Sequence, residues 1–468
     1  MTKEIWRLDA TAVAAGIRSG DFSSREAVSS CLQRLDEVNP QLNAIIESRA
    51  DEALAAADTA DKAVVDGAEL GPLHGVPISV KANQDLSGWA TVNGSESLKD
   101  NMASETSPCI QNLLDAGAIV IGRSNTPEFS VRWETTNDFY GATDNPWNSE
   151  LTPGGSSGGA AASVAAGISP LATGTDLGGS LRVPAQACGV ASIKPGRGRV
   201  PDFNSTDPAE PGLGFQLFNV NGFFARSVRD LQLGLPVMSA GDWRDPWWSP
   251  TPLQDGVKHP HKIALVLDPG GSAISEQVQS GVITAGKLLS NAGYEIEEVV
   301  PPALEEALDI WRTICLGEIV TSLKPAVGDI CGPRMQRCLE HYSAMLPKGF
   351  SEASMVDAHA RRRGVLRQWA EFFLDYPLIV GPVGMQPPFS RDADLESLET
   401  SLGVIDSQRL TVSINALNLP AATVPVGVSG GLPQVVQIIG PQFSEMRCLS
   451  AAAAIENQVD PITPIDPR

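Results

Sequence analysis

The first 60 residues carry apolar side chains at intervals of three to four positions, which is the period of a helix. This spacing predicts helices over 8–17 and 24–38. Ser23 and Ser24 stand at the start of the second run, where a serine hydroxyl accepts hydrogen bonds from the first backbone N–H groups of a helix. We therefore expect one of these serines to cap the second helix.

Beyond residue 70, the apolar runs become short and are bounded by glycine or proline, which predicts buried strands rather than helices. Residues 262–300 form a strand–helix–strand unit, the arrangement from which parallel sheets are built by right-handed crossovers. The predicted strands lie at 76–80, 118–121, 263–267, 378–380, 422–426 and 435–439, with helical patterns over 108–116 and 273–292 between them.

These elements predict a single α/β domain over residues 1–468, with a central twisted mixed sheet covered by helices on both faces. A chain of 468 residues in which 42% are apolar is able to bury a large core. Residues 200–260 are rich in Pro, Gly, Asp and Trp. We expect a long loop region over the core there, interrupted by apolar pieces such as 220–235.

Composition narrows the possible partners and the compartment. The balance of 34 basic against 55 acidic residues gives a net charge of −21, which repels nucleic-acid phosphates. The seven cysteines form no C-x-x-C pair, and such a scattered set is typical of reduced thiols in the cytoplasm. We find neither the apolar core of a signal peptide nor an apolar run of membrane-spanning length. We therefore expect a cytoplasmic protein without a nucleic-acid or membrane partner.

The segment TPGGSSGG at 152–159 places Ser156 among glycines and precedes an alanine-rich stretch at 160–167 that predicts a helix packed closely against a sheet. A glycine-rich turn before a core helix is the simplest interpretation. The segment also matches G-x-S-x-G, the nucleophile elbow of α/β-hydrolases. That elbow requires a strand directly before the serine, whereas the preceding residues are polar and rich in Pro and Gly.

A second glycine-rich segment, GTDLGGS at 174–180, ends on Ser180. Two glycines before a serine allow successive backbone N–H groups to point into one cavity, as stabilisation of a developing oxyanion requires. Pro184 is suited to the first turn of a helix, which would place Ser180 near a helix start. The alternative is a tight turn that holds Asp176, and for Asp176 and Arg182 we favour a role in shaping this loop.

Lys81 ends the apolar run VPISV. Burial of a lysine lowers its pKa, because the charged form loses its hydration, and a neutral amine is a usable base. Considered without the other segments, Lys81 could instead extend its side chain to the surface and keep its charge in water. A serine needs a base before it becomes a nucleophile, and the glycine-rich segments contain no histidine.

Taken in order along the chain, these segments resemble those of the amidase signature family. The resemblance covers most of the chain, with its core at about 70–200 and divergent, pocket-forming regions at about 200–260 and 300–400. The matching segments lie at 73–83, 122–129, 140–148, 152–159, 174–185, 192–200, 418–427 and 431–440.

The resemblance implies a Ser180 nucleophile, a bridging Ser156 that typically follows a cis peptide bond, and Lys81 as the base. It also implies oxyanion donors at the backbone of Leu177, Gly178, Gly179 and Ser180. The stretch 129–131 would lie beside the cleft, and we expect substrate contacts from Phe129, Ser130, Trp133 and Ser156. Many relatives have Asp after the lysine, whereas this chain has Ala82.

The implied reaction is the hydrolysis of a small carboxamide through a Ser180 acyl-enzyme, with no cofactor or metal and with a possible homodimer. The alternatives are the glutaminase component of a tRNA-dependent amidotransferase (its A-type chain), an α/β-hydrolase esterase and a homologue that binds without catalysis. The excess of acidic residues disfavours binding to tRNA, whose phosphates are also negatively charged.

Other residues have weaker signals. Trp89, Phe129, Trp133 and Trp311 are candidates either for an apolar acyl pocket or for the core. Trp247 and Trp248 lie in a loop-like context that suits a lid, a dimer contact or simple burial. His259 and His261 weakly suggest a metal, but no third ligand accompanies them. We expect structural roles for His74 and Cys188.

Overall fold

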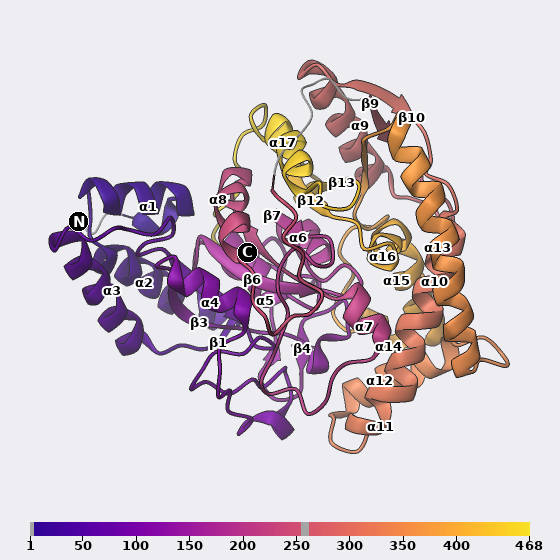
Figure 1. Ribbon diagram of the computed structural model, residues 1–468, viewed down its shortest axis with the longest axis horizontal. Helices are drawn as coiled ribbons and strands as arrows, with labels where there is room; N and C mark the ends of the chain where they lie inside the picture. The colour runs from indigo at the N-terminus through magenta and orange to yellow at the C-terminus, as the bar shows by residue number, and fades with distance from the viewer. Residues whose placement is uncertain (1–3, 254–261) are drawn as a thin grey trace.

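The computed structural model describes residues 4–253 and 262–468. Its centre is an eleven-stranded sheet in the order β1-β3-β2-β6-β8-β7-β12-β13-β11-β9-β10 (Figure 1). These strands are β1 (Ile45–Glu47), β2 (Pro77–Lys81), β3 (Ile119–Ser124), β6 (Leu171–Asp176), β7 (Ala191–Lys194), β8 (Val220–Ala225), β9 (Lys262–Leu265), β10 (Glu295–Glu298), β11 (Leu378–Pro382), β12 (Ala421–Ser429) and β13 (Leu432–Ile439). A small separate hairpin pairs β4 (Thr136–Asn137) with β5 (Gly141–Ala142).

The sheet is mixed, as the sequence predicted. Strand β2 runs parallel to β3 and β6, whereas β6, β8, β7, β12, β13 and β11 pair with one another antiparallel. At the far edge β9 is parallel to both β11 and β10. The predicted strand–helix–strand unit is therefore confirmed, with α9 (Glu276–Asn291) as its helix.

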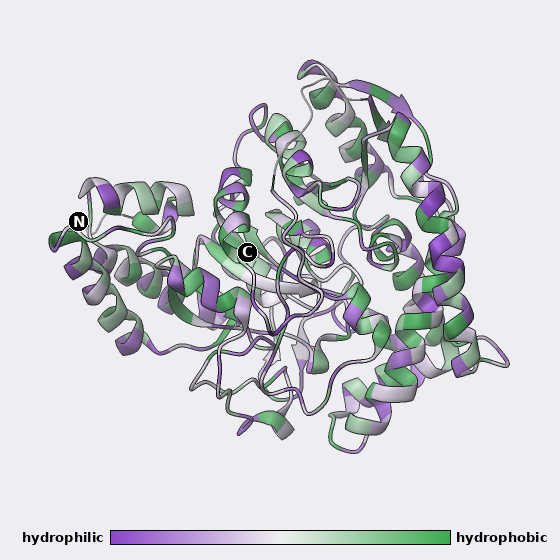
Figure 2. Ribbon diagram, in the orientation of Figure 1, coloured by the Kyte–Doolittle hydropathy of each residue, from purple (hydrophilic) through white to green (hydrophobic). Residues whose placement is uncertain are grey.

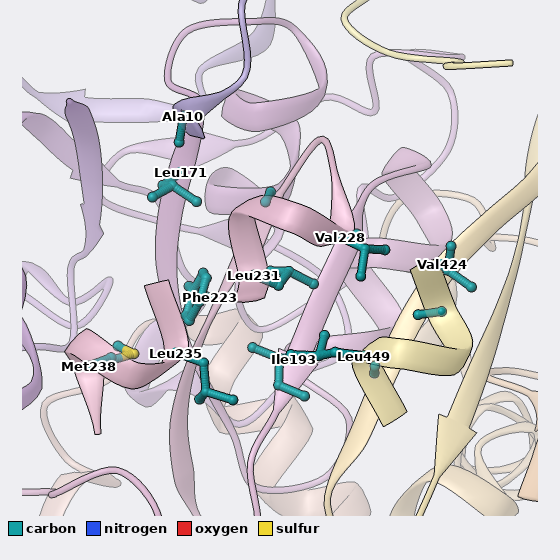
Figure 3. Close-up of a cluster of buried hydrophobic side chains, with 14 of the residues drawn as sticks. Ala10, Leu171, Ile193, Phe223, Val228, Leu231, Leu235, Met238, Val424 and Leu449 are labelled. Carbon is teal, nitrogen blue, oxygen red and sulfur yellow. The ribbon is translucent and has the colours of Figure 1, made fainter. Parts of the chain in front are cut away.

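Side chains alternate between two faces along each strand, and the core is divided accordingly. On one face, Phe223 of β8 and Ile193 of β7 pack beneath α8 (Val228–Met238) and α17 (Glu445–Glu456). Figure 3 shows Leu231 and Leu235 of α8 projecting into this cluster, together with Leu449 of α17. The same core also includes residues of α1 (Ala10–Ser19), α4 (Pro108–Asp115) and α9.

The opposite face is covered by two further groups of helices. Phe224, the neighbour of Phe223, packs with α2 (Ser24–Leu42), α3 (Ala50–Val65), α5 (Gly158–Ala165) and α6 (Arg182–Cys188). Beyond them, α10 (Leu304–Trp311), α12 (Pro333–Met345), α13 (Glu352–Asp375), α15 (Leu398–Ser407) and α16 (Arg409–Ala416) cover the half of the sheet that holds β9 and β11. Helices on both faces were predicted, and the structure confirms them (Figure 1).

The start of α2 is explained by its capping residues. The Ser23 hydroxyl accepts a hydrogen bond from Glu26 N at 3.0 Å and the Glu26 carboxylate accepts one from Ser23 N, so Ser23 is the cap of α2. The outer helix α13 carries hydrophilic residues along much of its length (Figure 2). The remaining short elements are η1 (Ile5–Arg7), η2 (Glu96–Leu98), η3 (Glu128–Ser130), α7 (Leu213–Phe218), α11 (Lys324–Val327), α14 (Ala393–Glu396) and the π-helical turns η4 (Arg312–Leu316) and η5 (Ile319–Leu323).

The expected loop region over 200–260 is only partly correct. Its apolar piece forms β8, a central strand of the sheet, and α8, while α7 precedes them. Strands β6 and β7 were not predicted either. Both strands are buried at every position, because small side chains allow the close approach of α5 and α6. They contain threonine, serine and glycine, and such residues give no hydrophobic signal in the sequence.

Candidate active site

Lys81 stands at the last position of β2 and is fully buried. Its Nζ lies within hydrogen-bond distance of two hydroxyl oxygens, that of Ser156 at 2.8 Å and that of Thr175 at 3.0 Å. Among the described residues, no carboxylate forms an ion pair with it. Burial lowers the pKa of Lys81 well below its usual value, and the charge of Asp176 only partly opposes this. The site therefore favours the neutral amine.

Ser156 follows a cis Gly155–Ser156 peptide bond and lies two residues before α5. Gly155 cannot be replaced easily, because a Cβ there would lie 2.5 Å from the backbone nitrogen of Glu134. The last strand before Ser156 is β5, which ends at Ala142. The α/β-hydrolase elbow requires a strand directly before the serine, so that interpretation of this segment is wrong.

Ser180 lies between the end of β6 and the start of α6 and is almost fully buried. The loop is organised by Asp176, which accepts from Gly179 N at 2.7 Å and from Leu181 N at 3.1 Å and pairs with Arg182 at 3.1 Å. Burial alone would raise the pKa of Asp176, but the charge and hydrogen bonds of Arg182 lower it to about 2. The expected loop-shaping role of Asp176 and Arg182 agrees with these contacts.

The backbone groups before Ser180 differ in their hydrogen-bond partners: Leu177 O and Gly178 O accept from the indoles of Trp311 and Trp133. Within the described chain, the N–H groups of Leu177, Gly178 and Ser180 have no hydrogen-bond acceptor, whereas that of Gly179 is held by Asp176. A developing oxyanion would find three unoccupied donors here.

A cavity opens beside Ser180, and its wall is mostly apolar. Three of the residues proposed from the sequence line this cavity: Ser130, Trp133 and Trp311. Phe129 does not line it and packs against the neighbouring core. Trp89 is not part of the wall: it lies in the core on the other face of the sheet, beneath the Arg49 guanidinium at 4.0 Å. The wall also contains Val131, Arg132, Leu177, Gly178, Cys315, Leu316, Ile319 and Tyr342.

The polar atoms of this wall mostly have partners in the protein. The Tyr342 hydroxyl donates to Val131 O at 2.8 Å, and the Ser130 hydroxyl donates to Asn93 Oδ1 at 2.8 Å. The indole N–H groups of Trp133 and Trp311 donate to backbone carbonyls. The cavity therefore offers a bound molecule mainly apolar and aromatic surface.

A buried cluster of Glu134, Asp392 and Asp394 lies behind the wall, with carboxylate oxygens close enough to hold a metal ion. The guanidinium of Arg132 already supplies a cation, at 2.6 Å from Asp394, 3.0 Å from Asp392 and 3.7 Å from Glu134. Burial raises the pKa of Glu134 to about 7, opposed by Arg132. The arrangement joins the loop of Arg132 and Glu134 to the start of α14 by charge pairing.

The weaker sequence candidates lie away from Ser180. His74 Nε2 is 3.0 Å from Ala60 O, and Cys188 is a fully buried thiol. Trp247 is half exposed and donates to Gln216 Oε1, whereas Trp248 donates to Ser239 O. His259 and His261 lie outside the described residues.

Sequence reasoning missed several residues of the site. Thr175 and Asn83 extend the hydrogen bonds of Lys81, since Asn83 Nδ2 donates to Thr175 Oγ1 at 3.1 Å. Asn415 Nδ2 donates to Asp176 Oδ1 at 2.8 Å from a helix 239 residues away. Thr175 and Asn83 carried a local signal, because they belong to the segments 174–185 and 73–83, whereas Asn415 carried none.

The chain matches the model of the Amidase family over residues 26–449, and it belongs to this family. An indoleacetamide hydrolase of Bradyrhizobium diazoefficiens is 41% identical over 458 residues, covering 97% of this chain and 87% of the relative. The A-type chain of the glutamyl-tRNA(Gln) amidotransferase of Chromohalobacter salexigens is 30% identical over 478 residues, covering 96% of each.

Solved structures agree with this assignment. A bacterial aryl acylamidase of the amidase signature enzymes superposes with a TM-score of 0.84 at 26% identity, covering 96% of each chain. The 6-aminohexanoate cyclic dimer hydrolase gives a TM-score of 0.84 at 25% identity, over 99% of this chain and 100% of that one. The protein is thus an amidase, a hydrolase of amide C–N bonds, with the predicted fold. Within the described residues, no helix is both long and apolar enough to cross a membrane.

Proposed function

We propose that this amidase hydrolyses the primary amide of a small aromatic acid, such as an arylacetamide, to the carboxylate and ammonia. The observation that carries the proposal is the position of Ser180 at a cavity walled by two indole rings, Trp133 and Trp311, which lie 5.8 Å apart between centroids. Aromatic rings pack favourably against such a wall. The relative that acts on indoleacetamide, by its name, supports the same class of acyl group.

The proposed chemistry is acyl transfer to Ser180. Neutral Lys81 takes a proton from Ser156, which takes the proton of the Ser180 hydroxyl as its oxygen attacks the amide carbonyl. The N–H groups of Leu177, Gly178 and Ser180 stabilise the oxyanion. Ser156 then gives its proton to the leaving amine, which departs as ammonia, and takes one back from Lys81. In deacylation, water attacks the acyl-enzyme and its proton passes through Ser156 to Lys81. The same relay returns that proton to Ser180 as the acid leaves. The 2.8 Å contact between Lys81 and Ser156 and the lowered pKa of Lys81 support this relay.

Substrate contacts are proposed for Trp133 and Ser130, which line the cavity. A contact is also proposed for Ser156, which hydrogen-bonds Lys81. Phe129 would act indirectly, because its backbone N–H donates to Asn93 O at 2.9 Å and thereby shapes the turn that carries Ser130. Both Phe129 and Ser130 have positive φ angles, of 54° and 59°, so this turn is strained for side chains other than glycine.

The glutaminase component of a tRNA-dependent amidotransferase is the second candidate, favoured by relatives of 30% to 32% identity. Glutamine carries an ammonium and a carboxylate that need charged partners when buried. The charged group of the wall, Arg132, already pairs with Asp392 and Asp394. This arrangement favours an uncharged acyl group over glutamine.

The test is ammonia release from indole-3-acetamide, phenylacetamide, propionamide and glutamine by the wild-type protein and the Ser180→Ala variant. We expect turnover of the two aromatic amides and its loss in Ser180→Ala. Ser163→Ala is the matched control, because Ser163 is an equally buried serine whose hydroxyl donates to Ala160 O, away from the cavity. Activity on glutamine alone would instead support the amidotransferase component.

We also propose a cytoplasmic location and no nucleic-acid partner. All seven cysteines lie in the described part of the chain, where each is buried and none forms a disulfide, which supports a reducing compartment. The homodimer that the sequence left open stays a prediction, and light scattering coupled to size-exclusion chromatography tests it.

A further inference from the structure

Two tryptophans of the cavity wall also hydrogen-bond the backbone of the nucleophile loop. Trp311 Nε1 donates to Leu177 O at 3.1 Å, and Trp133 Nε1 donates to Gly178 O at 2.8 Å. Both side chains are buried, at 2% and 6% exposure. Two consecutive peptide groups are therefore each held by an indole from outside the loop.

The direction of these bonds matters for catalysis. In a trans peptide unit, the carbonyl and the N–H point in opposite directions across a rigid plane. Leu177 O and Gly178 N–H belong to one such unit, so a bond that fixes the carbonyl also fixes the direction of the N–H. A donor to the carbonyl further polarises the unit and strengthens its N–H as a donor.

The two units differ in where their N–H groups point. The unit held by Trp133 has its N–H on Gly179, which donates to Asp176 at 2.7 Å, so this peptide is fixed at both ends. The unit held by Trp311 has its N–H on Gly178, which has no acceptor in the described structure. An oxyanion formed beside Ser180 would complete that second chain of hydrogen bonds.

The packing leaves little freedom for this arrangement to change. A Cβ on Gly178 would lie 2.7 Å from Trp311 Cζ2 and 3.5 Å from Trp133 Cζ2, so the rings lie directly against the loop. Gly179 has a φ of +108°, and a Cβ there would lie 2.6 Å from Thr411 Cγ2. The glycines thus permit a contact that holds the loop between two indoles and the Asp176 carboxylate.

We infer that Trp311 is a positioning residue of the reaction, orienting the Gly178 N–H toward the oxyanion, and that Trp133 fixes the adjoining peptide in the same way. The inference rests on the proposed Ser180 chemistry and adds to it a link between the acyl pocket and the oxyanion donors. The same rings would contact an aromatic acyl group, so pocket and oxyanion site share two side chains.

The test is the Trp311→Phe variant, which keeps an aromatic ring and removes the indole N–H. Steady-state kinetics are measured with phenylacetamide, which reaches the rings, and with propionamide, whose acyl group is too short to fill the pocket. We expect kcat to fall about 10- to 100-fold on both amides, less than the loss when an oxyanion donor is removed outright. KM for propionamide should stay within about threefold of the wild-type value.

Trp369→Phe is the matched control. Trp369 is 1% exposed and its indole donates to Pro302 O at 2.8 Å. The substitution therefore removes a buried indole–carbonyl bond from a residue that does not line the cavity. Trp369→Phe should lower the melting temperature as Trp311→Phe does, and its kcat should stay within about twofold of the wild-type value. A Trp311→Phe defect confined to KM for phenylacetamide, with kcat on propionamide unchanged, would overturn the inference and leave Trp311 as pocket wall only.

The substrates also separate this inference from the proposed function. If the wild-type protein turned over propionamide but not phenylacetamide, the aromatic substrate would be wrong, and propionamide would still test Trp311. If it turned over neither, p-nitrophenyl acetate, a small activated ester, would report acylation of Ser180. Should Trp311→Phe not fold, Trp311→Tyr, which also lacks the indole N–H, is measured instead, and a normal kcat on the small substrate would refute the positioning role.

Discussion

The side-chain nitrogen of Lys81 lies 2.8 Å from the hydroxyl oxygen of Ser156, at a place where both residues are withdrawn from water. A neutral amine has two N–H groups and one lone pair. Thr175 Oγ1 is 3.0 Å from the same nitrogen and also accepts from Asn83, which makes it the acceptor for one Lys81 N–H. The lone pair is then available to the Ser156 proton, as a base requires.

The first prediction concerns pH. Burial lowers the pKa of Lys81, and the proposed base is its deprotonated form. We expect kcat/KM for an uncharged amide to be constant at high pH. It should fall by about tenfold per unit as the pH drops below that lowered pKa. A profile from pH 5 to 10 measures this, and a rate that rose toward acid would contradict it.

The second prediction is that Lys81→Met lowers kcat/KM by about 10²- to 10⁴-fold, the usual contribution of a general base. Methionine fills a similar volume without a charge, so the fold should be kept. Lys99→Met is the control, because Lys99 is exposed on the surface. Equal activity of the Lys81→Met and control variants would exclude the relay.

The third prediction concerns Asp176→Asn. This change leaves the buried Arg182 without its carboxylate partner, which costs about 3–5 kcal/mol of unfolding free energy. Urea unfolding monitored by circular dichroism measures the loss. The charge of Asp176 also raises the pKa of Lys81, so the acid limb of the activity profile should move to lower pH in the folded variant. A limb that moved to higher pH would contradict this account.

The motifs of the site were predictable because their chemistry is local. Ser156, Ser180 and Lys81 stand in short glycine-rich or strand-end segments, and the order of these segments gave the family. The Trp311 and Asn415 contacts could not be predicted, since each joins the Asp176–Ser180 loop to a helix more than 130 residues away. Nothing in the local pattern around either residue specifies that partner.

The fold shows the same division. Strands such as β12 and β13 have branched apolar residues and were predicted, whereas β6 is built from Leu, Ala, Thr and Gly. Thr173 and Thr175 of β6 are buried, and their hydroxyls hydrogen-bond Gln84 and Lys81. Polar residues whose hydrogen bonds are satisfied in this way can be buried, but they give no hydrophobic signal in the sequence. Strand β6, which leads into the Ser180 loop, was therefore missed, whereas the apolar β2, which carries Lys81, was predicted.

The fourth prediction concerns Lys194, a second fully buried lysine, whose Nζ donates to Pro195 O at 3.0 Å and Leu419 O at 2.9 Å. Burial, with help from the charge of Arg182, lowers its pKa from 10.5 to about 7. Between these values the unfolded chain binds more protons, so stability rises with pH. Relative to Lys194→Met, the wild-type unfolding free energy should rise by at most about 1.4 kcal/mol per pH unit in this window.

Urea unfolding of both proteins at several pH values from 6 to 10 gives this difference. Contributions from other titrating groups, Lys81 included, are present in both proteins and cancel. Parallel stability curves would show that Lys194 keeps its ordinary pKa.

The fifth prediction concerns the acyl pocket. Ile319 begins η5 and lines the cavity, whereas Ile310 is buried in the same hydrophobic cluster but away from the wall. Replacement of either by alanine should cost about 2–5 kcal/mol of stability, because each leaves a cavity in a packed core. Only Ile319→Ala should raise KM for phenylacetamide, by about tenfold, since only that change removes apolar surface from a bound aromatic group.

Propionamide separates binding from general damage in these two variants. Its short acyl group does not extend to Ile319, so KM for propionamide should be unchanged in Ile319→Ala while KM for phenylacetamide rises. Equal effects of the two alanine substitutions on phenylacetamide would place the aromatic group elsewhere. In that case the indole pair of Trp133 and Trp311 would support the loop without forming the acyl pocket.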